Sequence, residues 1–281
     1  MNGKLYLVAT PIGNLEDMTL RAIRTLNEVD YIAAEDTRHT IKLLNHFEIK
    51  KPLQSYHEHN KTEKGNKIIE DLLNGQQVAL VTDAGTPAIS DPGEDLVKLC
   101  HKNKIEVTSI PGAVALINGL ILSGKDTRRF CFEGFLPFNK KERNNVLKGL
   151  KIETRTIIVY EAPHKLKGTI DDLFQALGNR NITITRELTK KFEEVLLMTL
   201  EEAVCYYKEN DPRGEYVLVI DGESQLKLEE EKVEKWLEMT LEEHLNIYMK
   251  KDMSKNEAIK TIAKDRNMTR KEVYNYFNRM E

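Results

Sequence analysis

Short apolar runs alternate with longer, helix-like segments through the first 125 residues of the chain. The apolar runs predict strands at 5–9, 31–34, 78–82 and 105–110, and the other segments predict helices at 19–29, 39–46, 62–74, 94–103 and 111–124. The runs are nearly continuously apolar rather than alternating, which is typical of strands that are covered on both faces. Strands separated by helices therefore predict a parallel sheet with helices packed on both of its faces.

The pattern starts again near residues 125–129, which are mostly charged. Further strands are predicted at 130–133, 155–160, 182–187, 195–199 and 216–221, with helices near 139–150, 164–177 and 200–209. The last two strands favour hairpin-like or mixed pairing, so this part should contain antiparallel strands. We therefore predict an α/β protein with an N-terminal domain at 1–125, a C-terminal domain at 126–223 and a helical extension at 224–281.

The predicted extension changes charge along its length. Residues 227–245 carry three Lys against seven acidic residues, whereas 250–281 carry nine Lys and Arg against five acidic residues. Within the basic part, Ser254 and Thr269 are each followed three residues later by Glu, which is the spacing of a capping box. Two short amphipathic helices around the tight turn at 266–269 indicate a helix-turn-helix-like unit with a basic surface. Alternatively, the pair is a helical tail that packs on a second copy of the chain.

Composition narrows the class of protein. With 40% apolar and 31% charged residues the chain is typical of a soluble globular protein, and no apolar run approaches the roughly 20 residues that span a bilayer. We expect no secretory signal, because the N-terminus runs directly into a strand. Three cysteines without a Cys-x-x-Cys pair fit a reducing cytoplasm and predict neither disulfides nor a zinc site. The net charge of −3 argues against a generally basic nucleic-acid coat, so nucleic-acid binding would need local patches.

Four loops of the first domain follow predicted parallel strands, at the edge where open α/β sheets bind ligands. They span 9–22, 33–40, 81–93 and 110–113. The stretch 81–93 lacks the Gly-Lys-Ser/Thr of a P-loop and the Gly-x-Gly-x-x-Gly of a dinucleotide fold. Glycines in the loops allow close backbone approach, prolines restrict the dihedrals, and Asp83 offers a carboxylate to polar or positive groups. We predict that the ligand is a zwitterionic, cationic nucleoside rather than a triphosphate.

Eight sequence motifs carry a resemblance to a known family. In chain order they are LVATPIGNLEDMTLRAIRTL, AAEDTRHTIKLL, TDAGTPAISDPG, IPGA, FEGFLP, YEAPHKL, RELTKKFEE and RGEYVLVI. Over residues 4–221 the chain resembles the bacterial ribosomal RNA small subunit methyltransferase I family, which belongs to the tetrapyrrole methylase superfamily. The basic helical tail is similar to the C-terminal extension of this family. Several of the motifs are long and unusual, which makes the resemblance specific.

The resemblance implies two α/β domains with a cleft between them that binds S-adenosyl-L-methionine. It implies methyl transfer to the ribose 2′-hydroxyl of a cytidine in the decoding region of 16S rRNA, with the small ribosomal subunit and a homodimer as expected partners. The cofactor-binding residues that it implies are Thr10, Pro11, Asp83, Gly85, Thr86, Ala88, Ile89, Ala113, Val114 and Tyr160. Two positions depart from the family pattern: Val114 replaces a usual Ser, and Leu197-Met198 replace a usual Arg-Gly.

A ribose hydroxyl is a weak nucleophile at neutral pH, so a nearby group should accept its proton or stabilise the developing alkoxide. Candidate catalytic side chains are Asp36, Arg38 and Lys190, with Glu35, Glu187 and Glu193 behind them. Lys190 would act as a base only if burial or a neighbouring cation kept it partly neutral; otherwise it would orient a phosphate or stabilise the oxyanion. The stretch 35–38 is equally explained as a capped helix start with an Asp–Arg ion pair.

RNA contact requires cations, and residues 138–167 hold eight Lys and Arg against three acidic residues. Phe135, Phe138 and Tyr160 lie among these charges, and aromatic faces with cations suit splayed bases and phosphates. The predicted RNA-binding residues are Lys140, Lys141, Arg143, Lys264, Arg270 and Lys271. His57 and His59 lack a further pair of metal-type residues, so a loop or RNA-facing role is favoured over a metal site.

Two other functions stay open at this point. A superfamily enzyme could instead methylate a tetrapyrrole or another small substrate, although the basic cleft rim and tail favour RNA. The chain could also be a regulator that binds nucleic acid through its C-terminal helices and a small ligand through its α/β part.

Overall fold

The computed structural model describes residues 2–278, apart from the side chain of Lys235, so Arg279 of the predicted basic tail lies outside the described residues. The chain divides into two compact units. One comprises Met1–Leu150 and Arg155–Asp221, and the other comprises Lys151–Thr154 and Gly222–Glu281. The first unit contains two five-stranded sheets, and the second is helical.

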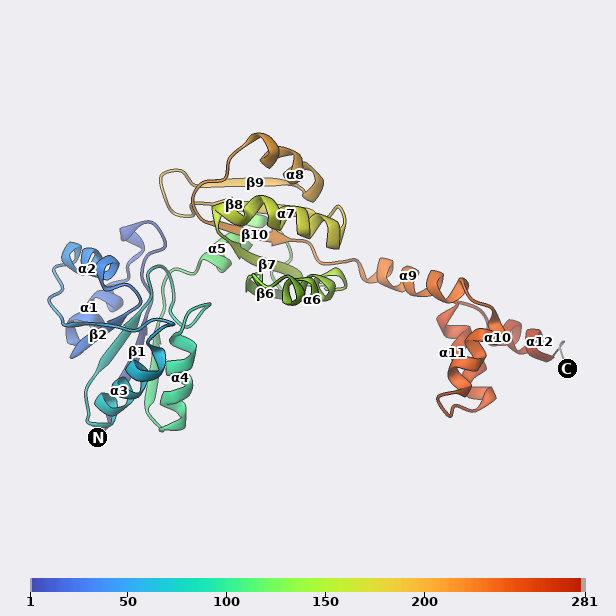
Figure 1. Ribbon diagram of the computed structural model, residues 1–281, viewed down its shortest axis with the longest axis horizontal. Helices are drawn as coiled ribbons and strands as arrows, with labels where there is room; N and C mark the ends of the chain where they lie inside the picture. Colours follow the sequence, from blue (N-terminus) through green and yellow to red (C-terminus); the bar gives the residue numbers. More distant parts are fainter. Residues whose placement is uncertain (1, 279–281) are drawn as a thin grey trace. The chain divides into compact units, whose positions relative to one another are not determined.

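The first sheet is parallel throughout and is covered by helices on both faces, which confirms the prediction (Figure 1). Its strands lie in the order β3 (Leu53–Ser55), β2 (Tyr31–Ala34), β4 (Val78–Val81), β1 (Lys4–Val8) and β5 (Glu106–Ile110). One face packs on α1 (Leu20–Glu28) and α2 (Thr37–His46), and the other on α3 (Lys61–Leu73) and α4 (Gly93–Lys102). The edge strand β3 is not predicted, because three half-buried residues give no apolar run.

The second sheet is mixed, as the sequence predicts. Its strands lie in the order β6 (Phe130–Phe135), β7 (Thr156–Glu161), β10 (Tyr216–Ile220), β8 (Asn181–Arg186) and β9 (Glu194–Thr199). Only β6 and β7 pair in parallel; β10 is antiparallel to both of its neighbours, and β8 and β9 form an antiparallel hairpin. The predicted hairpin of the last two strands, β9 and β10, is therefore not formed, because β8 lies between them. The helix α8 (Leu200–Glu209) follows β9 and carries the chain across β8, so β10 enters between β7 and β8.

Helices cover both faces of the second sheet as well. One face packs on α6 (Lys140–Lys151), α7 (Pro163–Leu177) and α8. The other face packs on α5 (Ala115–Ser123), where a Cβ at Gly119 would lie only 2.9 Å from Val217 Cγ1. The helix begins at Ala115 rather than at the predicted residue 111, because its N-cap residue Val114 has an extended backbone. Although the predicted boundary at 125 assigns this helix to the first domain, it packs on the second sheet.

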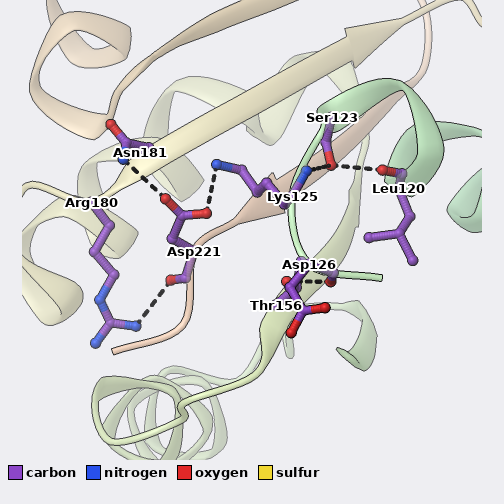
Figure 2. Close-up of polar contacts among 8 residues, drawn as sticks. All are labelled: Leu120, Ser123, Lys125, Asp126, Thr156, Arg180, Asn181 and Asp221. Carbon is purple, nitrogen blue, oxygen red and sulfur yellow. Dashed lines mark hydrogen bonds and ion pairs between the residues drawn. The ribbon is translucent and has the colours of Figure 1, made fainter. Parts of the chain in front are cut away.

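A polar network fastens the chain after α5 to the second sheet (Figure 2). The Lys125 side chain is only 9% exposed, and its Nζ lies 2.8 Å from Asp221 Oδ1 at the end of β10. Asp221 Oδ2 also accepts a hydrogen bond of 2.9 Å from Asn181 Nδ2 at the start of β8. Thr156 Oγ1, at the start of β7, donates to the Asp126 carbonyl at 2.8 Å. Lys125 and Asp126 are thus held to the end of β10 and the start of β7, and Asp221 in turn is held to the start of β8.

The helical unit contains α9 (Gln225–Leu237), α10 (Leu241–Met249), α11 (Lys255–Asp265) and α12 (Arg270–Asn278). Its core is formed by Ile259, Ile262, Ala263, Val273 and Phe277. The capping boxes predicted at the starts of the last two helices are present, since Ser254 and Thr269 each exchange hydrogen bonds with the Glu three residues later. None of the helices within 2–278 is long and apolar enough to cross a membrane.

Candidate active site

A cavity of about 520 Å³ opens between the carboxyl edge of the first sheet and the second sheet, within the first unit. Its walls come from the loops after β1, β2, β4 and β5, and from the ends of β6, β7, β8 and β10. The lining residues are Ile12, Glu35, Thr82, Asp83, Ala84, Gly85, Thr86, Ile89, Ser90, Asp91, Val114, Ala115, Phe135, Tyr160, Glu161, Ala162, Pro163, Leu188, Glu215, Tyr216 and Val217. This volume lies within the usual range of small-molecule sites.

Hydrogen bonds join the loops of the first sheet into one rigid wall. Thr10 and Gly85 exchange backbone hydrogen bonds of 2.9 and 3.1 Å, and Gly85 has a φ of 85°, which favours glycine. The Thr10 hydroxyl also donates to the Thr82 carbonyl at 3.2 Å. Thr86 Oγ1 donates to the Ala113 carbonyl at 3.1 Å, so the loop after β4 is held to the loops after β1 and β5.

The turn at the far end of the β4 loop is strained. Ala88 and Ser90 have φ values of 69° and 61°, in the left-handed region that non-glycine residues rarely occupy. Asp91 Oδ1 stabilises the turn by accepting hydrogen bonds from Ala88 N at 3.0 Å and Gly93 N at 2.7 Å. Strained backbone of this kind collects at functional sites, and here it borders the cavity.

The cavity lining is acidic. Five carboxylates and no Lys, Arg or His are present among the residues that line it: Glu35, Asp83, Asp91, Glu161 and Glu215. The backbone N–H of Asp36 donates to Asp83 Oδ1 at 3.0 Å, and Thr82 Oγ1 donates to Glu35 Oε2 at 2.9 Å. These contacts fix the two carboxylates at the ends of β4 and β2. The arrangement favours a ligand with positive charge and excludes a binding mode built on phosphate groups.

Tyr160 forms the wall from the second sheet. Its hydroxyl accepts a hydrogen bond of 2.9 Å from Leu116 N, and burial raises the pKa of the phenol. The ring makes edge contacts with Phe132 and Phe135, at centroid distances of 4.9 and 5.7 Å. Tyr160 therefore stays neutral and ties the start of α5 to the cavity.

The structure brings most of the predicted cofactor residues to this cavity. Asp83, Gly85, Thr86, Ile89, Val114 and Tyr160 line it. Thr10 and Ala113 bind the loops together from behind, Ala88 lies in the strained turn, and Pro11 precedes the lining residue Ile12. Their part in cofactor binding stays a prediction.

Residues 215–217 also line the cavity, and the sequence analysis did not predict them as site residues. These residues start β10, and they reach the cavity because β10 is antiparallel to its neighbours, which places its amino end at this edge. The RGEYVLVI motif that contains them was the available signal.

Asp36 and Arg38 form a capped start of α2, which is the alternative to a catalytic role for these two residues. Asp36 Oδ1 accepts from Arg38 N at 2.8 Å, and the guanidinium lies 2.8 Å from Asp36 Oδ2. The hydrogen bonds from the Arg38 side chain and backbone hold the pKa of Asp36 far below its ordinary value. A carboxylate stabilised in this way is a weak proton acceptor, and neither side chain lines the cavity.

Lys190 lies beside the cavity, between two carboxylates. Its Nζ donates to Glu187 Oε1 at 2.8 Å and to Glu215 Oε2 at 2.9 Å. Partial burial favours the neutral amine, but these hydrogen bonds outweigh it and raise the pKa of Lys190 above its ordinary value. The condition for a base role, a partly neutral Lys190, is therefore not met, and the contacts favour the alternative of a cationic side chain. Gly13 permits this placement, because a Cβ there would lie 2.4 Å from Lys190 Cγ.

The predicted RNA-binding residues differ in accessibility. Lys140 and Lys141 are exposed at the start of α6, and Lys264, Arg270 and Lys271 are exposed on the helical unit. Arg143 is occupied instead, because its guanidinium lies 2.6 Å from Asp172 Oδ2 and donates to Thr169 Oγ1 at 2.8 Å. No cluster of metal-type side chains is present within residues 2–278.

Comparisons with known proteins agree with this geometry. Residues 4–204 match the model of the tetrapyrrole (corrin/porphyrin) methylases. A protein of Halalkalibacterium halodurans named "Ribosomal RNA small subunit methyltransferase I" is 51% identical over 98% of this chain and 95% of its own length. The chain belongs to the ribosomal RNA small subunit methyltransferase I family. The family member of Bacillus subtilis is 50% identical, over 98% of this chain and 94% of that protein.

Solved structures show the fold of the family at lower identity. Diphthine synthase has a TM-score of 0.63 at 15% identity, and covers 79% of this chain and 91% of its own. A uroporphyrin-III C-methyltransferase from Thermus thermophilus, complexed with S-adenyl homocysteine, has a TM-score of 0.55 at 17% identity. The match covers 77% of this chain and 97% of that protein. At these identities the similarity establishes the tetrapyrrole methylase fold alone.

Proposed function

We propose that this protein transfers the methyl group of S-adenosyl-L-methionine to the ribose 2′-hydroxyl of a cytidine in the decoding region of 16S rRNA. The observation that carries the proposal is about 50% identity, over nearly the whole chain, to proteins named for methylation of small-subunit rRNA. We also propose a cytoplasmic location and the small ribosomal subunit as the physiological partner, because the relatives are named for small-subunit rRNA.

The cavity suits S-adenosyl-L-methionine. Its lining combines apolar side chains, including Ile12, Val114 and Val217, with carboxylates that complement a sulfonium and an ammonium group. Gly85 would allow a nucleoside to approach the backbone closely. The cofactor bound here would supply an electrophilic methyl group.

The residues of this chain would hold, orient and protect the reacting groups. The fixed carboxylates of Glu35 and Asp83 would bind donor groups, and the apolar lining would keep water out. Positioning of this kind can supply a large part of a rate acceleration. Lys190, as a cation at the cavity edge, would orient a phosphate or stabilise negative charge that develops on the ribose oxygen.

RNA would be held by exposed cations outside the cavity. Lys140 and Lys141 begin α6, and four residues separate this helix from the strand whose last residue, Phe135, lines the cavity. Lys264, Arg270 and Lys271 on the helical unit would add backbone contacts that raise affinity without reading sequence.

We also propose a homodimer that forms through the outer face of α5. Ile117, Ile121 and Leu122 on this helix are 41, 62 and 42% exposed, and Leu197 on the edge strand β9 is 69% exposed. Exposed apolar side chains on a helix beside an open strand edge favour a protein partner. A second copy fits this surface, because it would bring an identical apolar face.

Labelled-methyl transfer tests the proposed function. Small ribosomal subunits that lack the modification, naked 16S rRNA and porphyrinoid intermediates would be compared as acceptors, and the label would be located by resistance to alkaline cleavage. We expect transfer to a single cytidine 2′-oxygen of the rRNA and none to the porphyrinoids. Transfer to a porphyrinoid instead would support the small-substrate alternative, and no turnover with any acceptor would contradict the proposal.

Replacing Asp83 tests the placement of the cofactor. Asp83→Asn removes a negative charge from the cavity, and charged hydrogen bonds contribute about 1.5–3 kcal/mol, so we expect roughly 10- to 100-fold weaker cofactor binding by calorimetry. Asp171→Asn, on the exposed surface of α7, is the matched control and should bind as the wild type does. Unchanged affinity in Asp83→Asn would show that the cofactor binds elsewhere.

A further inference from the structure

A one-residue bulge turns Phe135 toward the cavity. In the parallel pairing of β6 with β7, Phe132 lies opposite Ile158, but Phe135 rather than Gly134 lies opposite Tyr160. Strict alternation would place Phe135 on the opposite face of the sheet, because it is an odd number of residues from Phe132. The extra residue moves it to the face that carries Tyr160, and bulges that redirect a side chain are common beside active sites.

The bulge depends on Gly134. This residue has a φ of 62°, and a Cβ on it would lie 3.0 Å from Ser90 Oγ in the strained turn. The β6 strand therefore reaches the β4 loop only where no side chain intervenes. Phe135 follows directly, lines the cavity, and remains 53% exposed despite its edge contact with Tyr160.

A second aromatic residue, Phe138, lies in the loop between β6 and α6 and does not line the cavity. It is 91% exposed, and Lys165 Nζ lies 5.4 Å from its ring centroid. Lys165 belongs to the first turn of α7, two residues after Pro163, which lines the cavity. The Phe138 ring is therefore almost fully open to solvent and has a cation over one face.

We propose that Phe135 stacks on the base of the target nucleotide and that Phe138 stacks on a neighbouring base. This inference rests on the proposed function, and it adds that the target must be unstacked from the RNA for its ribose to enter the cavity. Charge complementarity selects RNA as the occupant. Lys165 lies over the Phe138 ring, and the exposed Lys140 and Lys141 begin α6 two residues after it, so these cations would meet the phosphates beside the stacked bases. An apolar protein segment would gain nothing from these cations.

Leucine and tyrosine substitutions separate stacking from simple burial. Phe135→Leu keeps apolar bulk but removes the aromatic face, so we expect kcat/KM for small subunits to fall by about 5- to 150-fold, the loss of one base stack. Phe135→Tyr should retain most of the wild-type kcat/KM. Phe138→Leu and Phe138→Tyr should follow the same pattern, with more of the loss appearing as a higher KM. Cofactor affinity by calorimetry should stay within about twofold in all four variants. Ile152→Ala, an exposed apolar residue beyond the far end of α6, is the control.

The outcomes distinguish this inference from the proposed function. Wild-type rates in both Leu variants, with an active wild-type enzyme, would overturn the stacking and leave the methyl transfer intact. Parallel loss of cofactor affinity in Phe135→Leu would make Phe135 part of the cofactor wall and also overturn it. A wild-type protein that transfers no methyl group to rRNA would overturn both.

Discussion

At the scale of single residues, hydrogen bonds decide which charged groups can take part in proton transfer. Lys190 and Asp36 were both candidates for accepting the ribose proton. Glu187 and Glu215 keep Lys190 cationic, and Arg38 keeps Asp36 a weak base. The Asp36–Arg38 pair is local, and it was one of the two explanations that the sequence offered for residues 35–38. Glu215 instead lies directly before β10, a strand that is distant in the sequence from Lys190, so this partner could not be predicted.

Arginine at position 190 distinguishes a cationic role from a basic one. Lys190→Arg keeps a positive charge that cannot be lost at any ordinary pH, so we expect it to retain activity within about tenfold. Lys190→Met leaves Glu187 and Glu215 without their shared cation, and we expect a loss of about 10- to 100-fold in kcat/KM. Lys191→Met is the control. Equal, severe losses in the Arg and Met variants would instead indicate that Lys190 acts as a base.

At the scale of elements, the sequence predicted what depends on local pattern and missed what depends on strand order. The buried run at 78–81 gives an unambiguous strand, and the loop after it carries Asp83 to the predicted edge. The insertion of β10 between β7 and β8 leaves no local trace, so the contribution of Glu215 to the cavity could not be predicted. The helices α9 and α10 were likewise missed as individual elements, because the acidic composition dominated that stretch.

The helical unit should lose stability as the pH falls. His244 is fully buried, stacks on Trp236 with centroids 4.0 Å apart, and accepts a hydrogen bond at Nδ1 from Arg266 Nε. Burial, together with the Arg266 charge, lowers the pKa of His244 in the folded state, although Asp265 opposes this. The unfolded chain therefore binds the proton more readily, and the stability present above about pH 6.5 is lost below it.

Fluorescence of Trp236, the single tryptophan, reports on this site directly. We expect the midpoint temperature of unfolding, followed by this fluorescence, to decrease as the pH is lowered from about 7.5 to about 5.5. In His244→Gln the midpoint temperature should depend less on pH. His101→Gln, an exposed histidine of α4, should leave the slope unchanged. If the midpoint temperature of His244→Gln depends on pH as strongly as that of the wild type, other titratable groups cause the loss of stability.

At the scale of the whole molecule, the surface of α5 should determine the oligomeric state. We expect a dimer by sedimentation equilibrium, and a monomer when Ile121 and Leu197 are both replaced by Glu, because two charges would have to be buried at the interface. Ile152→Glu, which is exposed elsewhere, should remain dimeric. A wild-type monomer at micromolar concentration would contradict the proposed homodimer.

The place of residues 111–114 in the chain has a further consequence. They are the single covalent crossing from the first sheet to α5, which is packed on the second sheet, and their last residue forms part of the cavity wall. The connection between the two sheets is therefore also part of the surface that a ligand in the cavity would contact. A molecule seated against Val114 would touch both the wall built by the first sheet and the start of the helix that packs on the second.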